Sequence, residues 1–310
     1  MQIERIGVHE SVERIFPPER LRDAIAADGI GQEVVVVGDD VGGVDAVVTL
    51  TWDEDWLDQG LSWIQSIQAG VDRFPFDALR ERDIVLTNAT GVHGDSVGET
   101  VATSMLMFAR RFHDYLRNQV DHEWAIPAWD GPFTLKDRTV CIVGLGTLGQ
   151  GVAERAAGLG MHVTGVKRTV ENVPHVDHVY PADDLHEAIS DAQFVVLACP
   201  LTEDTHHLIA GPELERMRDD AYLVNVARGP VVDEGALIAA LEAGTVAGAH
   251  LDVFEEEPLP ADSPLWDREN VIISPHKAGS WEGYYRGVAE IVRENLDRLE
   301  TGEAFHNRVV

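Results

Sequence analysis

Short apolar runs alternate with amphipathic segments over the N-terminal third of the chain. The runs are rich in Val and Ile and end near Gly, Asp or Asn, which is typical of buried strands bounded by turns. They cover residues 33–38, 45–51, 61–67 and 83–89. Residues 18–29 show helical spacing and end at Gly29. Strands that alternate with helices predict a parallel sheet covered on both faces.

A longer helical pattern follows this set. Ser96 and Glu99 have the spacing of a capping box, in which each side chain bonds the backbone N–H of the other residue. An apolar stripe recurs at helical intervals, at Val101, Met105, Phe108, Phe112 and Tyr115. This stripe predicts packing rather than chemistry. Residues 121–133 contain Pro and Trp without periodicity, so we expect an arm or a linker there.

A second alternating set begins at Thr139. It predicts helices that alternate with strands at residues 139–143, 162–166, 193–198, 221–226, 246–252 and 271–273. A final helix is expected around residues 282–300, stopped by Gly302. Its apolar face is formed by Val288, Val292, Leu296 and Leu299. The whole pattern predicts an α/β protein.

Charge is the unusual feature of the composition. Acidic residues number 54 against 24 basic ones, the formal net charge is -30, and lysine occurs only at positions 136, 167 and 277. In molar salt the Debye length falls to about 3 Å, which screens the self-repulsion of such a surface. Because the acids are spread along the chain, we expect a halophilic, solvated surface rather than a polyanion that binds basic partners. The same charge argues against binding to nucleic acid or anionic membranes.

Length and apolar content bound the class of protein. A chain of 310 residues with 45% hydrophobic residues can bury a large core, and its length predicts two domains. No apolar run reaches the roughly 18 residues that span a bilayer, and the N-terminus lacks an apolar signal core. We therefore expect a soluble, cytoplasmic protein. Cys141 and Cys199 are too few for a disulfide framework or a thiolate metal cluster.

A glycine-rich turn follows the strand predicted at residues 139–143. Gly144, Gly146 and Gly149 form a Gly-x-Gly-x-x-Gly pattern, with Thr147 and Leu148 in the first turn of the helix that it opens. The first glycine permits the tight turn, the second lets the backbone approach a pyrophosphate, and the third allows close helix–strand packing. Free N–H groups at the helix start favour phosphate. Packing alone is the competing interpretation, but both flanks fit dinucleotide binding.

The next predicted strand ends in cations, where a dinucleotide-binding fold commonly has a carboxylate. Lys167 lies 18 positions beyond Gly149, and Arg168 and Thr169 follow it. A carboxylate there would bind the ribose hydroxyls of NAD and repel a 2′-phosphate, whereas Lys167 and Arg168 would attract that phosphate. A solvated surface pair is the competing interpretation, which is weaker in a chain so poor in lysine. We therefore predict a preference for NADP(H), with NAD(H) tolerated.

Three polar segments follow later predicted strands, at the edge where open α/β sheets bind ligands. They supply Arg228, Glu257 and His276, which are a fixed cation, a carboxylate and an imidazole. Each alone has an ordinary explanation, as a surface ion, part of an acidic run or a packed histidine. Their joint position at strand ends, with the glycine turn, favours a catalytic set.

With these segments the sequence closely resembles the D-2-hydroxyacid dehydrogenase family over almost the whole chain. The matching motifs are GLGTLG at the glycine turn, ARGPVVDEGAL at residues 227–237, LDVFEEEP at residues 251–258 and the Pro275-His276 pair. Residues 199–205 (CPLTEDT) resemble the family's loop after the next cofactor strand. Residues 66–72 (SIQAGVD) resemble its substrate loop, although a simple turn is a serious competitor there.

The resemblance implies a fold and a set of roles. It implies two Rossmann-like or flavodoxin-like, doubly wound α/β domains with parallel sheets and a cleft between them. The substrate-binding domain would span residues 1–95 and 280–310, and the dinucleotide-binding domain residues 96–279. A homodimer, D stereochemistry and a substrate carboxylate held by the N–H groups of Ala69, Gly70 and Val71 are also implied. Further cofactor contacts are implied for Cys199, Pro200, Thr205, Val226, Ala227, Arg228, Asp252, His276, Ala278 and Gly279.

The predicted catalytic set fits the reduction of a small 2-keto acid. The cofactor would supply the hydride. Arg228 can bind the carboxylate and polarise the carbonyl oxygen, and His276 can donate a proton because imidazoles titrate near about 6.5. Glu257 can accept from the other ring nitrogen and fix the tautomer. The substrate side chain stays open, since pyruvate, glyoxylate, hydroxypyruvate and branched keto acids all fit.

Other functions on this fold remain open. Formate-type dehydrogenases carry glutamine where Glu257 stands, and phosphoglycerate-type enzymes fit the cations at Lys167 and Arg168 poorly. A redox-sensing corepressor, which binds dinucleotide and a partner protein, is not separated from an enzyme by these residues. His206 and His207 suggest a metal site, but neighbouring side chains should point in different directions and no third ligand has suitable spacing. We therefore expect no metal.

Overall fold

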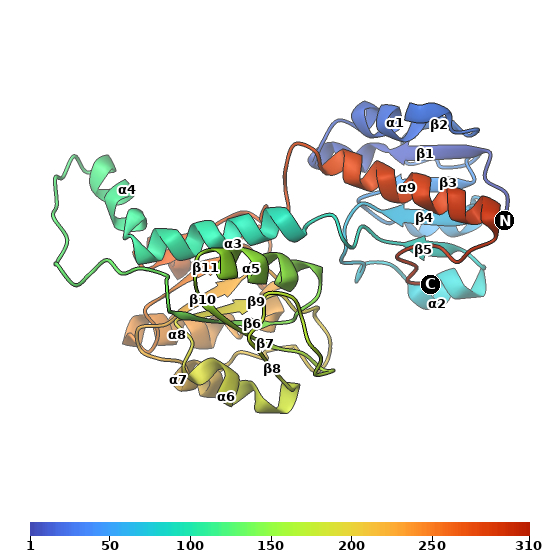
Figure 1. Cartoon of the computed structure of the whole chain (residues 1–310). Helices are drawn as coiled ribbons and strands as arrows, with labels where there is room; N and C mark the ends of the chain where they lie inside the picture. Colours follow the sequence, from blue (N-terminus) through green and yellow to red (C-terminus); the bar gives the residue numbers. More distant parts are fainter. The chain divides into compact units, whose positions relative to one another are not determined.

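The computed structural model describes the backbone of residues 1–310 and every side chain except that of Asp28. The chain forms two compact units. Unit 1 comprises Met1–Val92 and Ser280–Val310, and unit 2 comprises His93–Gly279 (Figure 1). Among the described residues, no helix combines the length and the apolarity that crossing a bilayer requires.

Unit 1 is built on a five-stranded sheet in the order β2-β1-β3-β4-β5. Its strands pair in parallel. They are β1 (Arg5–His9), β2 (Glu33–Val37), β3 (Ala46–Thr49), β4 (Trp63–Ser66) and β5 (Val85–Thr87). Ala46 and Val48 face one core cluster and Val47 faces another, so successive residues of β3 serve opposite faces of the sheet.

Helices cover both faces of this sheet. They are α1 (Pro18–Ala26), α2 (Phe76–Glu81) and α9 (Tyr284–Thr301). Helices α1 and α9 lie side by side on one face, where Leu21 and Val288 share a core cluster (Figure 1). Leu79 of α2 packs with Trp56 on the other face. The segment around Trp56 is a short 3-10 helix, Glu54–Asp58, and a second one, Glu10–Arg14, follows β1.

Unit 2 is built on a seven-stranded sheet in the order β12-β11-β10-β9-β6-β7-β8, again with parallel pairings. Its strands are β6 (Thr139–Val143), β7 (His162–Val166), β8 (His178–Tyr180), β9 (Phe194–Leu197), β10 (Tyr222–Asn225), β11 (Gly248–Leu251) and β12 (Val271–Ile273). The strand order reverses between β6 and β9, since β7 and β8 lie on one side of β6 and β9 to β12 on the other. Ligands of doubly wound folds bind at such a switch point, beyond the carboxyl ends of the strands.

Two groups of helices cover the sheet of unit 2. The covering helices are α3 (Gly94–Ala109), α5 (Thr147–Gly158), α6 (Leu185–Ser190), α7 (Gly211–Arg216) and α8 (Glu234–Ala243), whereas α4 (Phe112–Val120) has no buried residue. Side chains of α3 and α5 pack in one core cluster, and those of α6, α7 and α8 pack in another. Helices α3 and α5 lie against each other at a glycine contact, since a Cβ on Gly151 would be 2.0 Å from the carbonyl oxygen of Gly94.

The long helix predicted from residue 96 differs in two respects. Helix α3 begins at Gly94, and the Ser96 hydroxyl donates to the carbonyl of His93, so the capping box expected for Ser96 and Glu99 does not form. The apolar stripe is also interrupted after Ala109. Arg111 adopts a left-handed backbone conformation with φ 58, and a separate helix, α4, starts at Phe112 with its apolar side chains exposed.

The segment after α4 has the character expected of an arm. Figure 1 shows α4 and the chain that follows it extending away from the sheet of unit 2. No helix or strand is assigned over residues 121–133, within the described part of the chain. Trp124, Ile126 and Trp129 are almost fully exposed, at 95%, 84% and 94%. An apolar surface of this size commonly marks an interface.

Candidate active site

The glycine turn connects β6 to α5 at the switch point of unit 2. Gly144 has φ 97, and a Cβ there would lie 2.7 Å from the backbone of Cys199, so this glycine lets the turn pack against the segment after β9. A Cβ on Gly149 would lie 2.0 Å from the carbonyl oxygen of Gly144, which requires glycine for the close packing. At Gly146 a Cβ would meet nothing within 4 Å. The turn is therefore packed at its first and third glycines and open at its second.

These features fit a dinucleotide. Gly146 is the N-cap of α5, and Thr147 and Leu148 open the helix. The first N–H groups of a helix have no carbonyl partner within it and carry positive partial charge. The open space beside Gly146 lets a phosphate approach them. The donor set is thus suited to a pyrophosphate.

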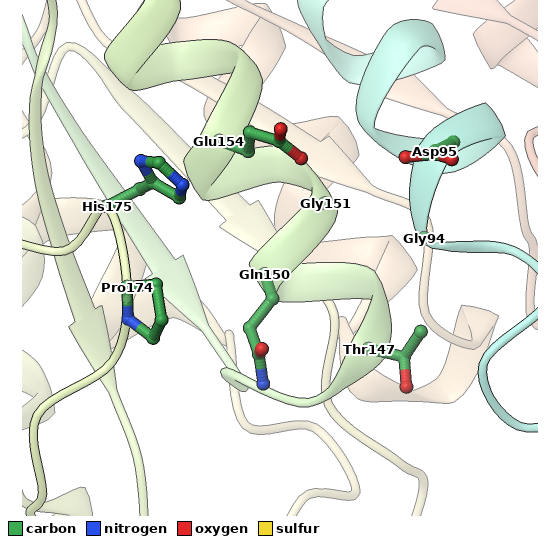
Figure 2. Close-up of a pocket in the computed structure, with 8 residues that line it drawn as sticks. All are labelled: Gly94, Asp95, Thr147, Gln150, Gly151, Glu154, Pro174 and His175. Carbon is green, nitrogen blue, oxygen red and sulfur yellow. The ribbon is translucent and has the colours of Figure 1, made fainter.

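A separate pocket of about 320 Å³ flanks the same helix. Figure 2 shows Thr147, Gln150 and Glu154 on α5, with His175 beyond Glu154 and Asp95 across from Thr147 on α3. Asp95 and Glu154 place two carboxylates on its lining, which disfavour a phosphate. The sequence did not indicate this pocket, and its carboxylates distinguish it from the glycine turn.

The cations predicted for a 2′-phosphate follow β7 directly. Lys167 is partly buried, and Arg168 and Thr169 are exposed. The Lys167 ammonium forms an ion pair with the carboxylate of Glu171, four residues further along the chain. The sequence analysis did not predict this pair, because i to i+4 spacing indicates a contact only on a helix and residues 167–171 are not helical. Glu171 competes with any anion for Lys167.

Arg228 is positioned by buried neighbours. Asn225, at the end of β10, accepts from the N–H of Ala227 at 3.1 Å and donates to the carbonyl of Arg228 at 3.0 Å. The Arg228 guanidinium donates to the carbonyl of Ala227 at 2.8 Å. Gly229 brings the chain against residue 254, since a Cβ would lie 1.9 Å from the carbonyl carbon of Phe254. This close approach places the Arg228 segment beside the segment that carries Glu257.

His276 and Glu257 form a direct pair. The distance between Nδ1 of His276 and Oε2 of Glu257 is 2.8 Å, and both side chains are partly exposed, at 42% and 37%. The second oxygen of Glu257 accepts from the N–H of Phe254 at 3.2 Å. The bond to Nδ1 leaves Nε2 of His276 as the nitrogen available to a substrate.

The carboxylate of this pair stays ionised in the folded protein. Burial would raise the pKa of Glu257, but the hydrogen bond to His276, the imidazolium charge, the Phe254 N–H and Arg228 together hold this pKa below its ordinary value. Since Arg228 lowers the pKa of Glu257, its charge acts on the pair. The three predicted catalytic residues therefore form one electrostatic group within unit 2.

Asp252 braces the backbone that carries His276. Its carboxylate is 2% exposed and accepts from the N–H groups of Lys277 and Ala278, both at 2.9 Å, and from the hydroxyl of Ser274 at 2.5 Å. Its carbonyl accepts from the N–H of His276 at 2.8 Å. His276 has φ 53, a left-handed conformation that a non-glycine residue adopts only where its surroundings impose it. Asp252 thus shapes the loop, whatever contact it makes with a cofactor.

Further residues hold the same loop. His250 bonds the hydroxyl of Ser274 at 3.0 Å, and burial lowers the pKa of His250 to about 4, so its ring is neutral. Nδ1 of His93 lies 3.1 Å from the carbonyl oxygen of Gly279, and Thr100 donates to the carbonyl of Ala278. These hydrogen bonds were not predicted from the sequence, because the local sequence around a buried polar residue does not indicate which partner the fold brings to it.

The loop after β9 is held internally. The hydroxyl of Thr205 donates to the carbonyl of Pro200 at 2.6 Å and accepts from the N–H of Thr202 at 2.7 Å. Burial raises the pKa of the Cys199 thiol to about 11, so it is a neutral side chain. Val226 and Ala227 have buried side chains, so they can offer a ligand only backbone atoms.

The two adjacent histidines differ from expectation in their orientation. The centroids of the His206 and His207 rings lie 4.0 Å apart with a tilt of 32° between the ring planes, so the two side chains lie against each other rather than point in different directions. His207 bonds Glu255 through Nε2 at 2.9 Å. The described residues contain no group of three or more His, Cys, Asp or Glu side chains that could hold a metal ion.

The predicted substrate loop lies in unit 1, after β4. Its carbonyl groups are engaged by the protein, since Asn88 donates to Ala69 at 2.8 Å and Arg73 donates to Gly70 at 3.2 Å. Arg73 also bonds the hydroxyl of Ser66 at 3.0 Å. Val71 is buried and anchors the loop in the core of unit 1. This fixes the loop's conformation at the carboxyl edge of the sheet.

Comparisons with known proteins identify the family. A family model described as the NAD binding domain of D-isomer specific 2-hydroxyacid dehydrogenases matches residues 102–278. The glyoxylate reductase of Thermococcus gammatolerans is 35% identical over 314 residues, which cover 97% of this chain and 90% of that protein. The chain belongs to the D-isomer specific 2-hydroxyacid dehydrogenase family. It is therefore an NAD(P)-dependent oxidoreductase that acts on 2-hydroxy acids, as the sequence predicted.

Solved structures of this family have the same fold. A D-isomer specific 2-hydroxyacid dehydrogenase from Xanthobacter autotrophicus, in complex with NADPH and MES, has a TM-score of 0.85 at 29% identity, covering 100% of this chain and 98% of that one. An NADPH-dependent glyoxylate/hydroxypyruvate reductase from Sinorhizobium meliloti, in complex with NADP and sulfate, has a TM-score of 0.83 at 27% identity, covering 99% and 98%. The predicted α/β class with two parallel sheets is confirmed. The roles of individual residues stay predictions.

Proposed function

We propose that this protein reduces small 2-keto acids to D-2-hydroxy acids, with NADPH preferred to NADH. His276 would be the proton donor, Glu257 its partner and Arg228 the anchor of the substrate. Unit 2 would be the dinucleotide-binding domain and unit 1 the substrate-binding domain. The observation that carries the proposal is the 2.8 Å pair of His276 with Glu257, in electrostatic contact with Arg228.

The chemistry follows from what each side chain can do. The nicotinamide, when bound, supplies a hydride to C2 of the keto acid. Arg228 offers a planar fork of donors that can bind the carboxylate and strengthen its contact as charge develops on the carbonyl oxygen. Nε2 of His276 can deliver a proton to that oxygen, because Glu257 holds Nδ1. The N–H groups of Ala69, Gly70 and Val71 would contribute donors to the carboxylate from unit 1.

The cofactor preference rests on the cations after β7. The ammonium of Lys167 and the guanidinium of Arg168 would bind a 2′-phosphate, with the hydroxyl of Thr169 as a further donor. Two related structures contain NADPH or NADP, which supports the same preference here. Binding of the phosphate would require Lys167 to exchange its bond with Glu171.

We also propose a homodimer that covers the exposed arm. Phe112 and Leu116 of α4 are each 53% exposed, and Trp124 and Trp129 are almost fully exposed. Burying such aromatic side chains against a second copy would remove them from water. Light scattering after size exclusion in molar salt tests this, since a Trp124→Ser, Trp129→Ser variant should become monomeric while the unsubstituted protein has twice that mass.

The surface would suit a cytoplasm of high salt. With 54 acidic and 24 basic residues, self-repulsion is strong in dilute buffer and screened in molar salt. The temperature of unfolding should therefore rise with potassium chloride concentration. Activity assays belong at molar salt for the same reason.

The experiment is a steady-state assay of nicotinamide absorbance. Purified protein in molar salt is given glyoxylate, hydroxypyruvate, pyruvate or a branched keto acid, with NADPH and NADH side by side. Turnover of at least one keto acid with a lower KM for NADPH supports the proposal. Binding of dinucleotide without turnover of any keto acid would instead favour a redox-sensing binding protein.

A further inference from the structure

A buried histidine of unit 2 is connected to the loop that carries His276. His250 is the third residue of β11 and is 3% exposed, and Asp252 follows it two positions along the chain. Side chains two positions apart on a strand leave the same face of the sheet. Ala249 and Leu251 leave the other face, since both pack in the core cluster of α6, α7 and α8. His250 and the buried Asp252 are therefore neighbours on one face of the sheet.

The imidazole of His250 lies in an apolar row. The residues paired with it in the sheet are Val224 of β10 and Ile272 of β12. Burial among such neighbours costs free energy unless the ring nitrogens are hydrogen-bonded. Nε2 lies 3.0 Å from the hydroxyl oxygen of Ser274, whereas Nδ1 is buried and has no partner among the described residues. An apolar residue would avoid this cost, so the bond to Ser274 is what the imidazole adds at this position.

The protonation of the ring sets the direction of each hydrogen bond. Burial lowers the pKa of His250 to about 4, although the carboxylate of Asp252 opposes this effect, so the neutral ring carries one N–H. The Ser274 hydroxyl donates to Oδ1 of Asp252 at 2.5 Å. Its oxygen can therefore accept from Nε2–H of His250. A chain of hydrogen bonds thus runs from His250 through Ser274 to Asp252.

This chain ends at the backbone on both sides of His276. The carboxylate of Asp252 accepts from Ser274, which precedes His276, and from the N–H groups of Lys277 and Ala278, which follow it. His276 itself has φ 53, a left-handed conformation that costs a non-glycine residue free energy. The surrounding hydrogen bonds must offset that cost. Ser274 contributes to this set from the side that His250 orients.

We propose that His250 is a positioning residue for His276. It orients the hydroxyl of Ser274, which holds the carboxylate of Asp252. Asp252 in turn keeps His276 in the left-handed turn from which Nδ1 lies 2.8 Å from Glu257. The inference rests on the proposed reductase function, in which His276 donates the proton. His250 acts only through the protein and contacts neither substrate nor cofactor.

The variant His250→Leu removes the donor and suits the apolar row. Its melting temperature should stay within about 3 °C of the unsubstituted protein, because the unpartnered Nδ1 is removed as well. With a keto acid and NADPH, kcat should still fall about 10-fold, because His276 is held less exactly. The decline of kcat with rising pH should also begin at lower pH, because the pair with Glu257 is loosened.

Rescue by a conservative variant separates positioning from a loss of folded protein. His250→Gln keeps a side-chain N–H, so it should restore kcat to within about 3-fold of the unsubstituted value. It should also return the pH profile to its original position. A smaller folded fraction would lower kcat at every pH without moving the profile.

A double-mutant cycle tests whether His250 acts through Ser274. Ser274→Ala should lower kcat by a similar factor, and adding His250→Leu to it should cause no further loss, because the bond is already absent. Losses that multiply would overturn the inference. Ser104 of α3 supplies the matched control, since it is 2% exposed and its hydroxyl donates to the carbonyl of Val101 at 2.9 Å. Ser104→Ala should leave kcat and the pH profile unchanged.

Hydrogen exchange measures the loop without any turnover. The N–H groups of His276, Lys277 and Ala278 are all bonded to Asp252, so they exchange when the loop opens. The peptide that contains residues 274–279 should exchange about 10-fold faster in His250→Leu and in Ser274→Ala. In Ser104→Ala it should exchange at the rate of the unsubstituted protein.

The outcomes separate this inference from the proposed function. If the protein reduces a keto acid but His250→Leu has the pH profile and the exchange rate of Ser104→Ala, the positioning role is wrong and the reductase function stands. If the unsubstituted protein reduces no keto acid, the proposed function fails, and the role of His250 in proton donation fails with it. Faster exchange, an earlier decline with pH and rescue by His250→Gln together support the inference.

Discussion

The two sheets carry histidines of opposite character at their carboxyl edges. In unit 2, His276 is 42% exposed, sits in a strained loop after β12 and has a carboxylate partner at 2.8 Å. In unit 1, His9 ends β1, is 5% exposed, and its Nε2 has no hydrogen-bond partner among the described residues. Both sheets are parallel, so the topology alone does not assign these roles. The difference teaches that their surroundings decide the roles of the two histidines. A paired and exposed imidazole can exchange a proton, whereas burial opposes the charged form of the ring.

The largest expected effect in this comparison of the two histidines comes from substituting His276. The variant His276→Ala should lower kcat by about 10²- to 10⁴-fold, because the developing alkoxide loses its proton donor. His186 is the matched control, since its Nε2 pairs with Glu213 at 2.7 Å on a different part of the surface. His186→Ala should leave kcat unchanged in the same assay. Equal losses in the two variants would show that a surface His–Glu pair has no special role at this edge.

The cofactor edge of unit 2 is tested by removing its cations. The double variant Lys167→Asp, Arg168→Ala should raise the KM for NADPH by about 10- to 100-fold, because the charge-assisted bonds to the 2′-phosphate are lost. The KM for NADH, which has no such phosphate, should change little or fall. Titrating both cofactors against each variant makes this measurement. An equal rise in both values would remove the assignment of these residues.

The partner of His276 sets the pH dependence. The pKa of Glu257 is held below its ordinary value of 4.5, so its carboxylate is ionised at neutral pH, 2.8 Å from Nδ1 of His276. The stabilising effect of the Glu257 carboxylate is fully present above the pKa that Glu257 has in the unfolded chain. It is lost as the pH falls through the lower pKa of Glu257 in the folded protein. In Glu257→Gln, kcat should fall about 10-fold, and the decline of reduction with rising pH should begin at lower pH. A profile of kcat against pH that keeps its position would contradict the role of Glu257.

The smallest expected effect concerns Glu171. Its ion pair with Lys167 is solvated, since the side chains are 57% and 29% exposed. Such pairs contribute little, so Glu171→Gln should lower the KM for NADPH by only about 2- to 5-fold, with the KM for NADH unaffected. The gain should shrink as salt is added, because salt screens the competing pair in the unsubstituted protein. A higher KM for NADPH would mean that Glu171 positions Lys167 rather than competing for it.

Much of unit 2 could be predicted from local sequence. The strands around Cys141, Val195 and Leu223 are continuous apolar runs, because both faces of a parallel sheet are buried. The glycine turn is readable as a local pattern, although only Gly149 meets its steric neighbour, Gly144, within the turn, whereas Gly144 packs against the distant Cys199. The order of these strands along the chain then predicted which residues follow the carboxyl ends of the strands in the unit 2 sheet. Arg228, Glu257 and His276 are among them.

The remaining features of the fold and of the candidate site depend on contacts between residues that are far apart in the sequence or on details of backbone conformation, which the local pattern does not indicate. Strands β1 and β8 were not predicted, because β1 contains Gly7 between Ile6 and Val8 and β8 has only three residues. The interruption at Arg111 comes from one left-handed residue inside an apolar stripe. Asn225, Ser274 and His250 act through partners that the fold brings together. The burial of Nε2 of His9 without a partner among the described residues is a property of the packed unit and has no signal in the sequence.

The most direct test of the central claim is a crystal structure of the ternary complex with NADP and oxamate, an unreactive analogue of a keto acid. The account predicts Nε2 of His276 at a hydrogen-bonding distance of about 3 Å from the carbonyl oxygen of oxamate. It also predicts the guanidinium of Arg228 on the carboxylate and Glu257 still bonded to Nδ1. A complex in which the imidazole and the guanidinium both face away from bound oxamate would contradict the account.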